Sequence, residues 1–256
     1  MSEANQITVA IIGGTGLNTM SGVRVVEEHV VETEFGKPSS PVFELELEEV
    51  EGKPRFYFLP RHGKPHAVAP HLINYRANIA ALESLGVKKI LAVNAVGSID
   101  PKLNPKDIVV PEQVIDYTHG REASFFDGTI KPLQHFDFSD PFDAPLMESI
   151  KAVADKAGCN AIFEGVYGVT QGPRLETAAE IKRMAQDGAT LVGMTLMPEA
   201  VLAREVAIPY ASICLVVNPA AGVSQAIITM EEIYQAVEEG MGQVQVLLKA
   251  LVAELA

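Results

Sequence analysis

The chain has 256 residues, of which 48% are hydrophobic and 21% charged, a composition typical of a soluble globular enzyme with one large domain or two small ones. Its 33 acidic residues outnumber 20 Lys and Arg, and the net charge of −13 disfavours binding to nucleic acid or to an anionic membrane surface. A site for an anionic ligand would therefore need positive charge from one of the few basic residues, which draws attention to Arg61.

Seven short apolar runs predict β-strands, and most of them lack polar alternation. These runs are residues 7–12, 56–59, 90–93, 108–110, 166–170, 191–192 and 211–217. Continuous apolar strands are typical of a sheet that is covered on both faces. No linker, repeat or low-complexity tract divides the sequence, so we expect an α/β fold in a single domain, residues 1–256.

Helical patterns alternate with these strands and supply the covering layers. The predicted helices are residues 74–85, 145–157, 176–186, 198–206 and 230–255. Gly86, Gly158 and Gly188 follow the first three, as expected for residues that end helices. Gly240 and Gly242 interrupt the last helix and predict that another segment packs closely there.

Residues 112–142 lack a helical or strand pattern and are rich in Phe, so this segment is interpreted as a loop that is either a lid or a subunit contact. Cys159 and Cys214 lie far apart without metal-ligand spacing, which is typical of a reducing compartment. The polar first residues do not resemble a signal peptide, and no run reaches the roughly 18 apolar residues of a membrane span. We expect a cytoplasmic location.

Several turns after predicted strands carry groups that bind anions. Gly13-Gly-Thr-Gly16 follows the first strand, where backbone N–H groups and the Thr15 hydroxyl are suited to phosphate, although the motif fits neither a dinucleotide fingerprint nor a P-loop. Arg61 and His62 follow the second strand, and Asn94 and Ala95 follow the third. Thr195 follows the strand at 191–192. The alternative interpretations are a ligand-free glycine turn, a surface Arg and a solvated His.

Two further polar residues are suited to a purine edge. The Glu176 carboxylate could accept a hydrogen bond from a base, and the Asn218 amide could both donate and accept. The alternatives are a first-turn helix acid for Glu176 and a turn residue before Pro219 for Asn218.

These motifs together resemble those of the trimeric purine nucleoside phosphorylase family, in its methylthioadenosine/methylthioinosine branch. The segments that carry the resemblance are Gly13-Gly-Thr-Gly16, Leu59-Pro-Arg-His62, Thr170-Gln-Gly-Pro-Arg-Leu-Glu176, Gly193-Met-Thr195 and Val217-Asn-Pro-Ala220. They occur in the expected order, and the resemblance extends from about Ile7 to the last helix. It implies a central mixed β-sheet flanked by helices, a homotrimer, and phosphate as co-substrate with no metal or organic cofactor.

The resemblance also implies roles for individual residues. The phosphate pocket would comprise Thr15, Arg61, His62, Asn94, Ala95 and Thr195. The nucleoside would contact Met194 at the sugar, Glu176, Asn218, Pro219 and Ala220 at the base, Met230 at the 5′ end, and His135 from a neighbouring subunit. The catalytic residues would be Asn218, Glu176 and Thr195.

The base-reading positions favour 6-oxopurines. A 6-oxopurine presents an N1–H donor to Glu176, whereas adenine presents an acceptor there, and opposed acceptors in a buried site cost about 1–3 kcal/mol. The adenosine-type members of the family carry a small hydroxyl residue in place of Glu176, and aspartates in place of Asn218 and Ala220. Met230 stands where ordinary 6-oxopurine members have a histidine near the 5′-hydroxyl, and its thioether suits an apolar 5′-methylthio group. The alternative for Met230 is a core residue at a helix start.

The sequence therefore predicts phosphorolysis of 5′-methylthioinosine to hypoxanthine and 5-methylthioribose 1-phosphate. Three alternatives remain open: a methylthioadenosine phosphorylase, a nucleoside hydrolase and a catalytically silent purine-binding protein. The hydrolase would need a cluster of metal-binding aspartates, and the sequence has no closely spaced run of Asp. The presence of Arg61, His62, Thr195 and Glu176 together disfavours a silent protein.

Overall fold

The computed structural model describes residues 7–14, 20–224 and 228–256, so Thr15 lies outside the described residues. The strands are β1 (Val9–Gly13), β2 (Val23–His29), β3 (Val42–Leu47), β4 (Arg55–Pro60), β5 (Lys89–Ser98), β6 (Ile108–Val109), β7 (Gln113–Asp116), β8 (Ala161–Ile162), β9 (Val166–Val169), β10 (Leu191–Gly193) and β11 (Tyr210–Pro219). The helices are α1 (Tyr75–Ser84), α2 (Ala144–Ala157), α3 (Ala178–Gln186), α4 (Leu196–Glu205) and α5 (Met230–Leu255), with a short 3-10 helix at Pro70–Leu72.

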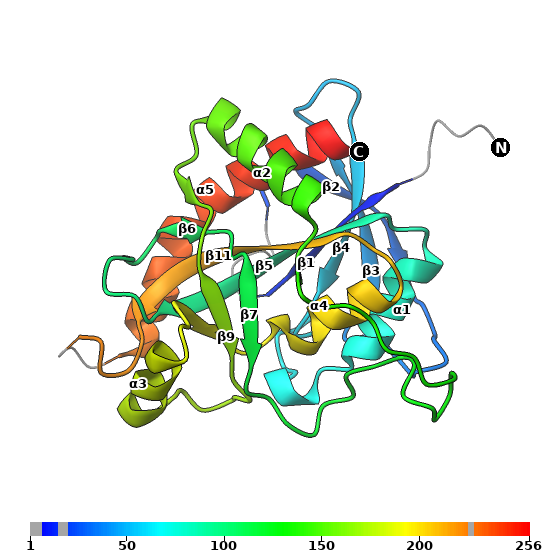
Figure 1. The fold of residues 1–256 in the computed structure, drawn as a ribbon. Helices are drawn as coiled ribbons and strands as arrows, with labels where there is room; N and C mark the ends of the chain where they lie inside the picture. The colour runs from blue at the N-terminus through cyan, green and yellow to red at the C-terminus, as the bar shows by residue number, and fades with distance from the viewer. Residues whose placement is uncertain (1–6, 15–19, 225–227) are drawn as a thin grey trace.

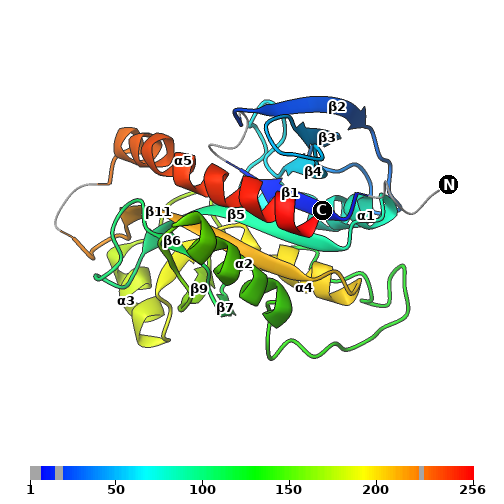
Figure 2. The ribbon, with the colours of Figure 1, turned by 90° about the horizontal axis from the view of Figure 1, so that it is seen from above.

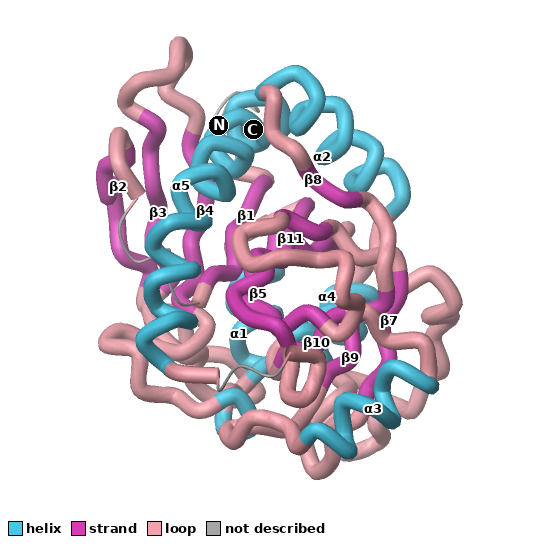
Figure 3. The backbone as a smooth tube through the Cα atoms, turned by 90° about the vertical axis from the view of Figure 1, so that its left-hand side faces the viewer, coloured by secondary structure: helices cyan, strands magenta, loops and turns pink. Residues whose placement is uncertain are grey.

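The strands form one mixed sheet in the order β2-β3-β4-β1-β5-β10-β9-β7, and β11 joins β5 to β6 and β8. β1 is parallel to both β4 and β5, whereas β10 is antiparallel to β5. Figure 3 shows β2, β3 and β4 together at one side of the molecule and β7 and β9 at the other. This arrangement confirms the predicted α/β fold with a central mixed sheet.

Helices cover both faces of the central strands, as the apolar strand pattern predicts. In β1, Val9 and Ile11 join one hydrophobic core, while Ala10 and Ile12 join the other, because successive side chains of a strand point to opposite faces. The first core contains α2 and α5, which pack against each other, and the second contains α1 and α4. Figure 1 shows these helix pairs above and below the strands, and Figure 2 shows α5 running beside α2.

All seven predicted strands are present, and the structure adds β2, β3, β7 and β8. None of the four contains a long apolar run: β2 is largely exposed, and β8 has only two residues. β3 carries Glu44 and Glu46 among its apolar residues, and both glutamates are buried beside Arg55. The prediction that a turn follows residue 93 is wrong, because β5 continues to Ser98.

The predicted helices are present with shifted ends. Gly86, Gly158 and Gly188 each have positive φ beyond the helix, which confirms their predicted place at helix ends. The α3 helix begins at Ala178 with Thr177 as its N-cap, so the structure excludes the first-turn interpretation of Glu176. A Cβ at Gly240 would lie 2.7 Å from a Leu215 methyl, whereas nothing lies within 4 Å of one at Gly242, so close packing is confirmed only for the former.

The aromatic segment 112–142 contains β7 and packs in part on the chain's own core. Phe125 and Phe142 are buried there, whereas His135 is exposed. No helix in the described part of the chain is long and apolar enough to cross a membrane.

Candidate active site

A cavity opens where β5 changes its neighbour. The ladder between β1 and β5 ends at Ala92, and the ladder between β10 and β5 begins at Gly97. Among the described residues, no strand lies beside the intervening part of β5 on that edge. Ala95 is exposed although the strand around it is buried. Such a change of neighbour in an α/β sheet leaves a crevice at the strand ends, where ligands bind.

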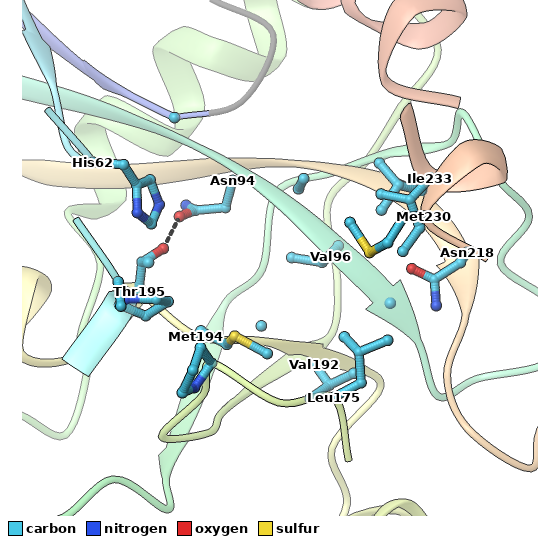
Figure 4. A pocket seen from close by; sticks show the side chains of 18 of the residues that line it. His62, Asn94, Val96, Leu175, Val192, Met194, Thr195, Asn218, Met230 and Ile233 are labelled. Carbon is cyan, nitrogen blue, oxygen red and sulfur yellow. Dashed lines mark hydrogen bonds between the residues drawn. The ribbon is translucent and has the colours of Figure 1, made fainter. Parts of the chain in front are cut away.

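The cavity has a volume of about 450 Å³ and gathers most of the predicted residues from separate parts of the sequence. The predicted residues that line it are Arg61, His62, Asn94, Ala95, Glu176, Met194, Thr195, Asn218, Ala220 and Met230. Figure 4 shows His62, Asn94 and Thr195 at one end, and Asn218, Met230 and Ile233 at the other. The cavity therefore has a polar end, suited to a small anion, and an end of mixed character.

Arg61 is buried beneath the polar end, with 1% of its surface exposed, so the surface interpretation is wrong. Its Nε and Nη2 donate to the two carboxylate oxygens of Glu199 at 2.6 and 2.8 Å, and Nη1 donates to the Val93 carbonyl. Burial lowers the pKa of Arg61, but the charge of Glu199 and its hydrogen bonds raise the pKa by more than burial lowers it. The pKa of Arg61 therefore lies above its ordinary value. The guanidinium remains charged, and its charge is balanced within the protein.

One N–H of Arg61 Nη1 has no partner among the described residues, and this atom lies 3.7 Å from where a Cβ of Gly14 would stand. The absence of a side chain at Gly14 therefore keeps the approach to Arg61 open. An Arg61→Ala variant would leave the buried Glu199 with the Tyr210 hydroxyl but without a positive charge to balance it, so the fold as well as any anion site depends on Arg61.

His62 is held in one tautomer. Its Nδ1 lies 2.8 Å from the Val68 carbonyl, which can only accept, so Nδ1 carries the hydrogen. Burial, together with the nearby Arg61 charge, lowers the pKa of His62 to about 4. At neutral pH the ring is therefore uncharged, and Nε2 offers a lone pair. In this state Nε2 can accept a hydrogen bond at the polar end of the cavity but cannot donate one.

Asn94 and Thr195 form a buried hydrogen-bonded pair. The Thr195 hydroxyl donates to the Asn94 Oδ1 at 2.8 Å, and the Asn94 amide donates to Ser212 at 2.8 Å. Thr195 is also the N-cap residue of α4, but its side chain makes no capping hydrogen bond. Thr195 lines the cavity, and a hydroxyl that donates one hydrogen bond can still accept another.

Glu176 lines the cavity and lies one residue before the N-cap of α3. Its Oε1 accepts a hydrogen bond from the Thr170 hydroxyl at 2.5 Å. Its Oε2 makes no hydrogen bond or ion pair within the described residues, so it can accept a hydrogen bond from a ligand.

Asn218 enters the cavity from β11 at a register shift between Val216 and Asn218. Such a bulge re-aims a side chain relative to a regular strand. One amide N–H of Asn218 donates to the Pro219 carbonyl at 2.7 Å, which leaves the other N–H and the Oδ1 for a ligand.

Apolar side chains line the rest of the cavity. Val96, Val192, Leu175 and Ile233 supply flat hydrophobic surface around the polar groups. Met230 is the first residue of α5 and is 54% exposed, so the interpretation as a core residue is wrong. Met194 lies between the two ends in Figure 4.

Three predicted residues are not among those lining the cavity. Pro219 contributes only its carbonyl, which accepts from Asn218, and His135 lies on the exposed segment 112–142. Thr15 lies outside the described residues. Sequence reasoning missed Glu199, although an acid within the apolar stretch of α4 is a signal of a buried partner.

One group of side chains in the described part of the chain has the composition of a metal site. Glu27, His29 and Glu44 place ligand atoms within 4.8 Å of one another on β2 and β3. Glu44 already accepts hydrogen bonds from Arg55 and His29, and none of these three possible ligands lines the cavity. This group is therefore separate from the cavity.

Comparisons with known proteins identify the family of the chain. The family model "Phosphorylase superfamily" matches residues 8–253. A "Probable S-methyl-5'-thioinosine phosphorylase" of Pseudomonas syringae pv. tomato is 48% identical over 93% of this chain and 96% of its own length. A "Probable 6-oxopurine nucleoside phosphorylase" of Thermococcus kodakarensis is 39% identical over 94% of this chain and 90% of its own.

Among solved structures, the methylthioadenosine phosphorylase of Schistosoma mansoni in complex with adenine superposes with a TM-score of 0.89 at 32% identity. The match covers 97% of this chain and 92% of that one. Both the family model and the relatives span nearly the whole sequence, and the chain belongs to the phosphorylase superfamily.

Proposed function

We propose that the protein catalyses the phosphorolysis of 5′-methylthioinosine, releasing hypoxanthine and 5-methylthioribose 1-phosphate. The observation that carries this proposal is the Glu176 carboxylate, whose Oε1 is occupied by Thr170 and whose Oε2 is free to accept. A 6-oxopurine supplies a donor for that oxygen at N1–H. The names of several relatives, which are S-methyl-5′-thioinosine and 6-oxopurine nucleoside phosphorylases, support the same substrate class.

The base end would read both groups of the 6-oxopurine edge. Glu176 Oε2 would accept from N1–H, while the free N–H of Asn218 would donate to O6 or N7. Val192 and Leu175 would cover the ring, and Ala220 would leave room that an aspartate would fill. A neutral amide does not ionise usefully, so Asn218 would stabilise charge on the leaving purine by hydrogen bonding rather than as a general acid.

The 5′ end would favour an apolar substituent. Met230 and Ile233 line the cavity near Asn218 and offer no strong hydrogen bond to a 5′-hydroxyl. A methylthio group would bury apolar surface against them. This contact is worth only about 1–3 kcal/mol, so we expect weaker selection at the 5′ position than at the base.

The polar end would hold phosphate. Because the Arg61 charge is balanced by Glu199, the pair contributes no net charge, and Arg61 would act through its free Nη1 N–H. His62 Nε2 and the Thr195 oxygen are acceptors, so they favour a phosphate that carries a hydrogen. Ala95 and Asn94 would line the same pocket, as would Thr15.

In the reaction, a phosphate oxygen would form a bond to C1′ while the bond from C1′ to N9 breaks. The bonding electrons would leave with the purine, which takes a proton from solvent. The transition state would resemble an oxocarbenium ion, as in other glycosyl cleavages. The catalytic residues Asn218, Glu176 and Thr195 would act by positioning and by hydrogen bonding to developing charge, without a metal or an organic cofactor.

A second candidate is the release of adenine from 5′-methylthioadenosine, because the similar solved structures include methylthioadenosine phosphorylases. Ionised Glu176 opposes this reaction, since its oxygen would face the unprotonated N1 of adenine. The experiment that separates the candidates measures product formation from methylthioinosine, inosine, methylthioadenosine and adenosine, each with and without phosphate. Equal rates without phosphate would overturn phosphorolysis, and faster cleavage of methylthioadenosine than of methylthioinosine would overturn the assignment of the base.

We further propose that the chain acts as a single domain in a cytoplasmic homotrimer, in which His135 of a neighbouring subunit covers the ribose. The exposed position of His135 and the open, apolar surface of Met230 are compatible with a partner at the cavity mouth. Analytical ultracentrifugation tests the stoichiometry, and a fully active monomer at dilute concentration would contradict it.

A further inference from the structure

Arg121 makes an unusual set of hydrogen bonds beside the cavity. Its Nη1 donates to the carbonyls of Met194 and Met197 at 2.9 and 2.5 Å, and its Nη2 donates to those of Thr170 and Gln171 at 3.2 and 2.9 Å. The Nε lies 3.3 Å from the Gln171 side-chain oxygen. Nη1 also lies 3.3 Å from the Tyr75 hydroxyl. No carboxylate within the described residues forms an ion pair with Arg121, so uncharged oxygens, most of them backbone carbonyls, surround its charge.

The four carbonyls belong to the two segments that carry opposite ends of the cavity. Residues 170–176 follow β9 and lead to Glu176, while residues 193–197 begin at the last residue of β10 and contain Met194 and Thr195. The ladder between β9 and β10 ends with the Thr170 N–H donating to the Gly193 carbonyl at 2.8 Å. Beyond that bond the two segments leave the sheet, and Arg121 bridges them.

A planar guanidinium suits this task. Its N–H groups point in fixed directions, so two carbonyls on one edge and two on another are held at a set separation. Arg121 does not line the cavity, and its side chain comes from the loop that follows β7. Its guanidinium nitrogens already donate to protein oxygens, so we expect its effect on the reaction to pass through the two segments.

We propose that Arg121 is a positioning residue that holds the base-reading segment 170–176 and the sugar- and phosphate-binding segment 193–197 at the separation required by a bound nucleoside and phosphate. This proposal rests on the proposed phosphorolysis. The base and phosphate must be held together when C1′ passes between them, and a misplacement of about 1 Å can cost about 10²-fold in rate. The loss of Arg121 should therefore weaken both ends of the site at once.

The test compares the Arg121→Met and Arg121→Lys variants with the unmodified protein. Methionine keeps much of the side-chain length but removes every donor, and lysine keeps the charge without the planar fork. For Arg121→Met we expect kcat/KM to fall about 10²-fold, KM to rise for both nucleoside and phosphate, and the preference for methylthioinosine over methylthioadenosine to shrink. For Arg121→Lys we expect a partial recovery of all three quantities.

These readouts separate positioning from a general structural role. A variant that merely lowers the fraction of folded protein reduces kcat but leaves both KM values and the substrate preference unchanged. Unchanged KM values and preference in Arg121→Met would therefore overturn the proposal.

Arg76→Met is the matched control. Arg76 ties the same loop from α1, through Glu122 at 2.6 Å and Asp127 at 3.5 Å, but contacts neither cavity segment. We expect its KM values and substrate preference to match those of the unmodified protein. If Arg76→Met reproduces the effects of Arg121→Met, packing of the loop rather than the bridge of Arg121 is responsible, and the proposal fails.

Backbone hydrogen exchange keeps this inference separable from the proposed function. In Arg121→Met, amides of residues 170–176 and 193–197 should exchange faster than in the unmodified protein, while those of α5 should not change. Unchanged exchange in both segments would overturn the bridge whatever the activity. An unmodified protein that is inactive on all four nucleosides would refute the proposed reaction, and faster exchange in the variant would then still establish the bridge.

Discussion

Replacement of Glu199 by Gln tests the buried ion pair beneath the polar end of the cavity. Arg61 and Glu199 are 1% and 0% exposed, and two hydrogen bonds of 2.6 and 2.8 Å join them. The hydroxyl of Tyr210 also donates to Glu199, at 2.9 Å. Glutamine keeps the shape and one acceptor but removes the charge, and its NH₂ group would face a donor of Arg61.

The loss of one partner from a buried pair costs about 3–5 kcal/mol, because the remaining charge is left uncompensated. For a domain of this size, each kcal/mol lowers the melting temperature by about 2–4 °C, so we expect a decrease of about 6–20 °C. Phosphate should stabilise the variant more than the unmodified protein, since it restores an anion beside Arg61.

Differential scanning calorimetry at pH 7, at equal protein concentration and with or without phosphate, measures both effects. Glu254→Gln is the control, because the Lys156–Glu254 pair is 81% and 58% exposed and joined at 3.8 Å. Exposed pairs contribute less than about 1 kcal/mol, so this variant should melt close to the unmodified protein. If Glu199→Gln is destabilised by no more than Glu254→Gln, the reasoning about buried charge is wrong.

Glu176→Ser combined with Asn218→Asp should shift activity from 6-oxopurine toward adenine nucleosides, by up to about 10⁴-fold in the ratio of kcat/KM values; an unchanged ratio would exclude both residues as base readers. His62 should remain neutral from pH 5 to 8 because its pKa is lowered to about 4. If the imidazole NMR resonances assigned to His62 titrate near pH 6.5, this prediction is wrong. In the unfolded chain this histidine titrates near 6.5, so the stability contributed by neutral His62 is present above that pH and is lost as the pH falls toward 4. Urea unfolding of the unmodified protein and of His62→Gln across this pH range measures the loss. Gly242→Ala should stabilise α5 by up to about 1 kcal/mol, because nothing in the described part of the chain lies near the added Cβ. Gly240→Ala should be about 1–3 kcal/mol less stable than Gly242→Ala, because its Cβ would lie 2.7 Å from a side-chain atom. Equal free energies of unfolding for the two variants would refute the packing argument.

Hydrophobic periodicity predicted the central part of the fold because it reports local burial. Strands that are covered on both faces, such as β1 and β11, are largely apolar and were predicted from the sequence. The partly polar strands β2 and β3 were not, because Glu44 and Glu46 are buried through pairing with Arg55 rather than through apolar character. A local hydrophobic pattern does not show which charged residues will pair in the folded protein.

The sequence by itself determined the order of the motifs and placed most of the candidate residues near strand ends, where a sheet brings them together. Asn94 and Ala95 instead lie within β5, at the part of its edge that extends past the end of β1. The sequence does not contain this exchange of neighbours explicitly, because strand pairing depends on the arrangement of the whole sheet.

Only the tertiary structure decided the electrostatic state of the site. Arg61 was predicted from its place after a strand, but its partner Glu199 lies 138 residues further along the chain. The Val68 carbonyl fixes the tautomer of His62, and the bridge made by Arg121 depends on two segments that meet beside the cavity. Residue type and periodicity are local properties, whereas the charge and hydrogen-bonding state of a buried group are set by whichever distant atoms the fold brings within about 3 Å of it.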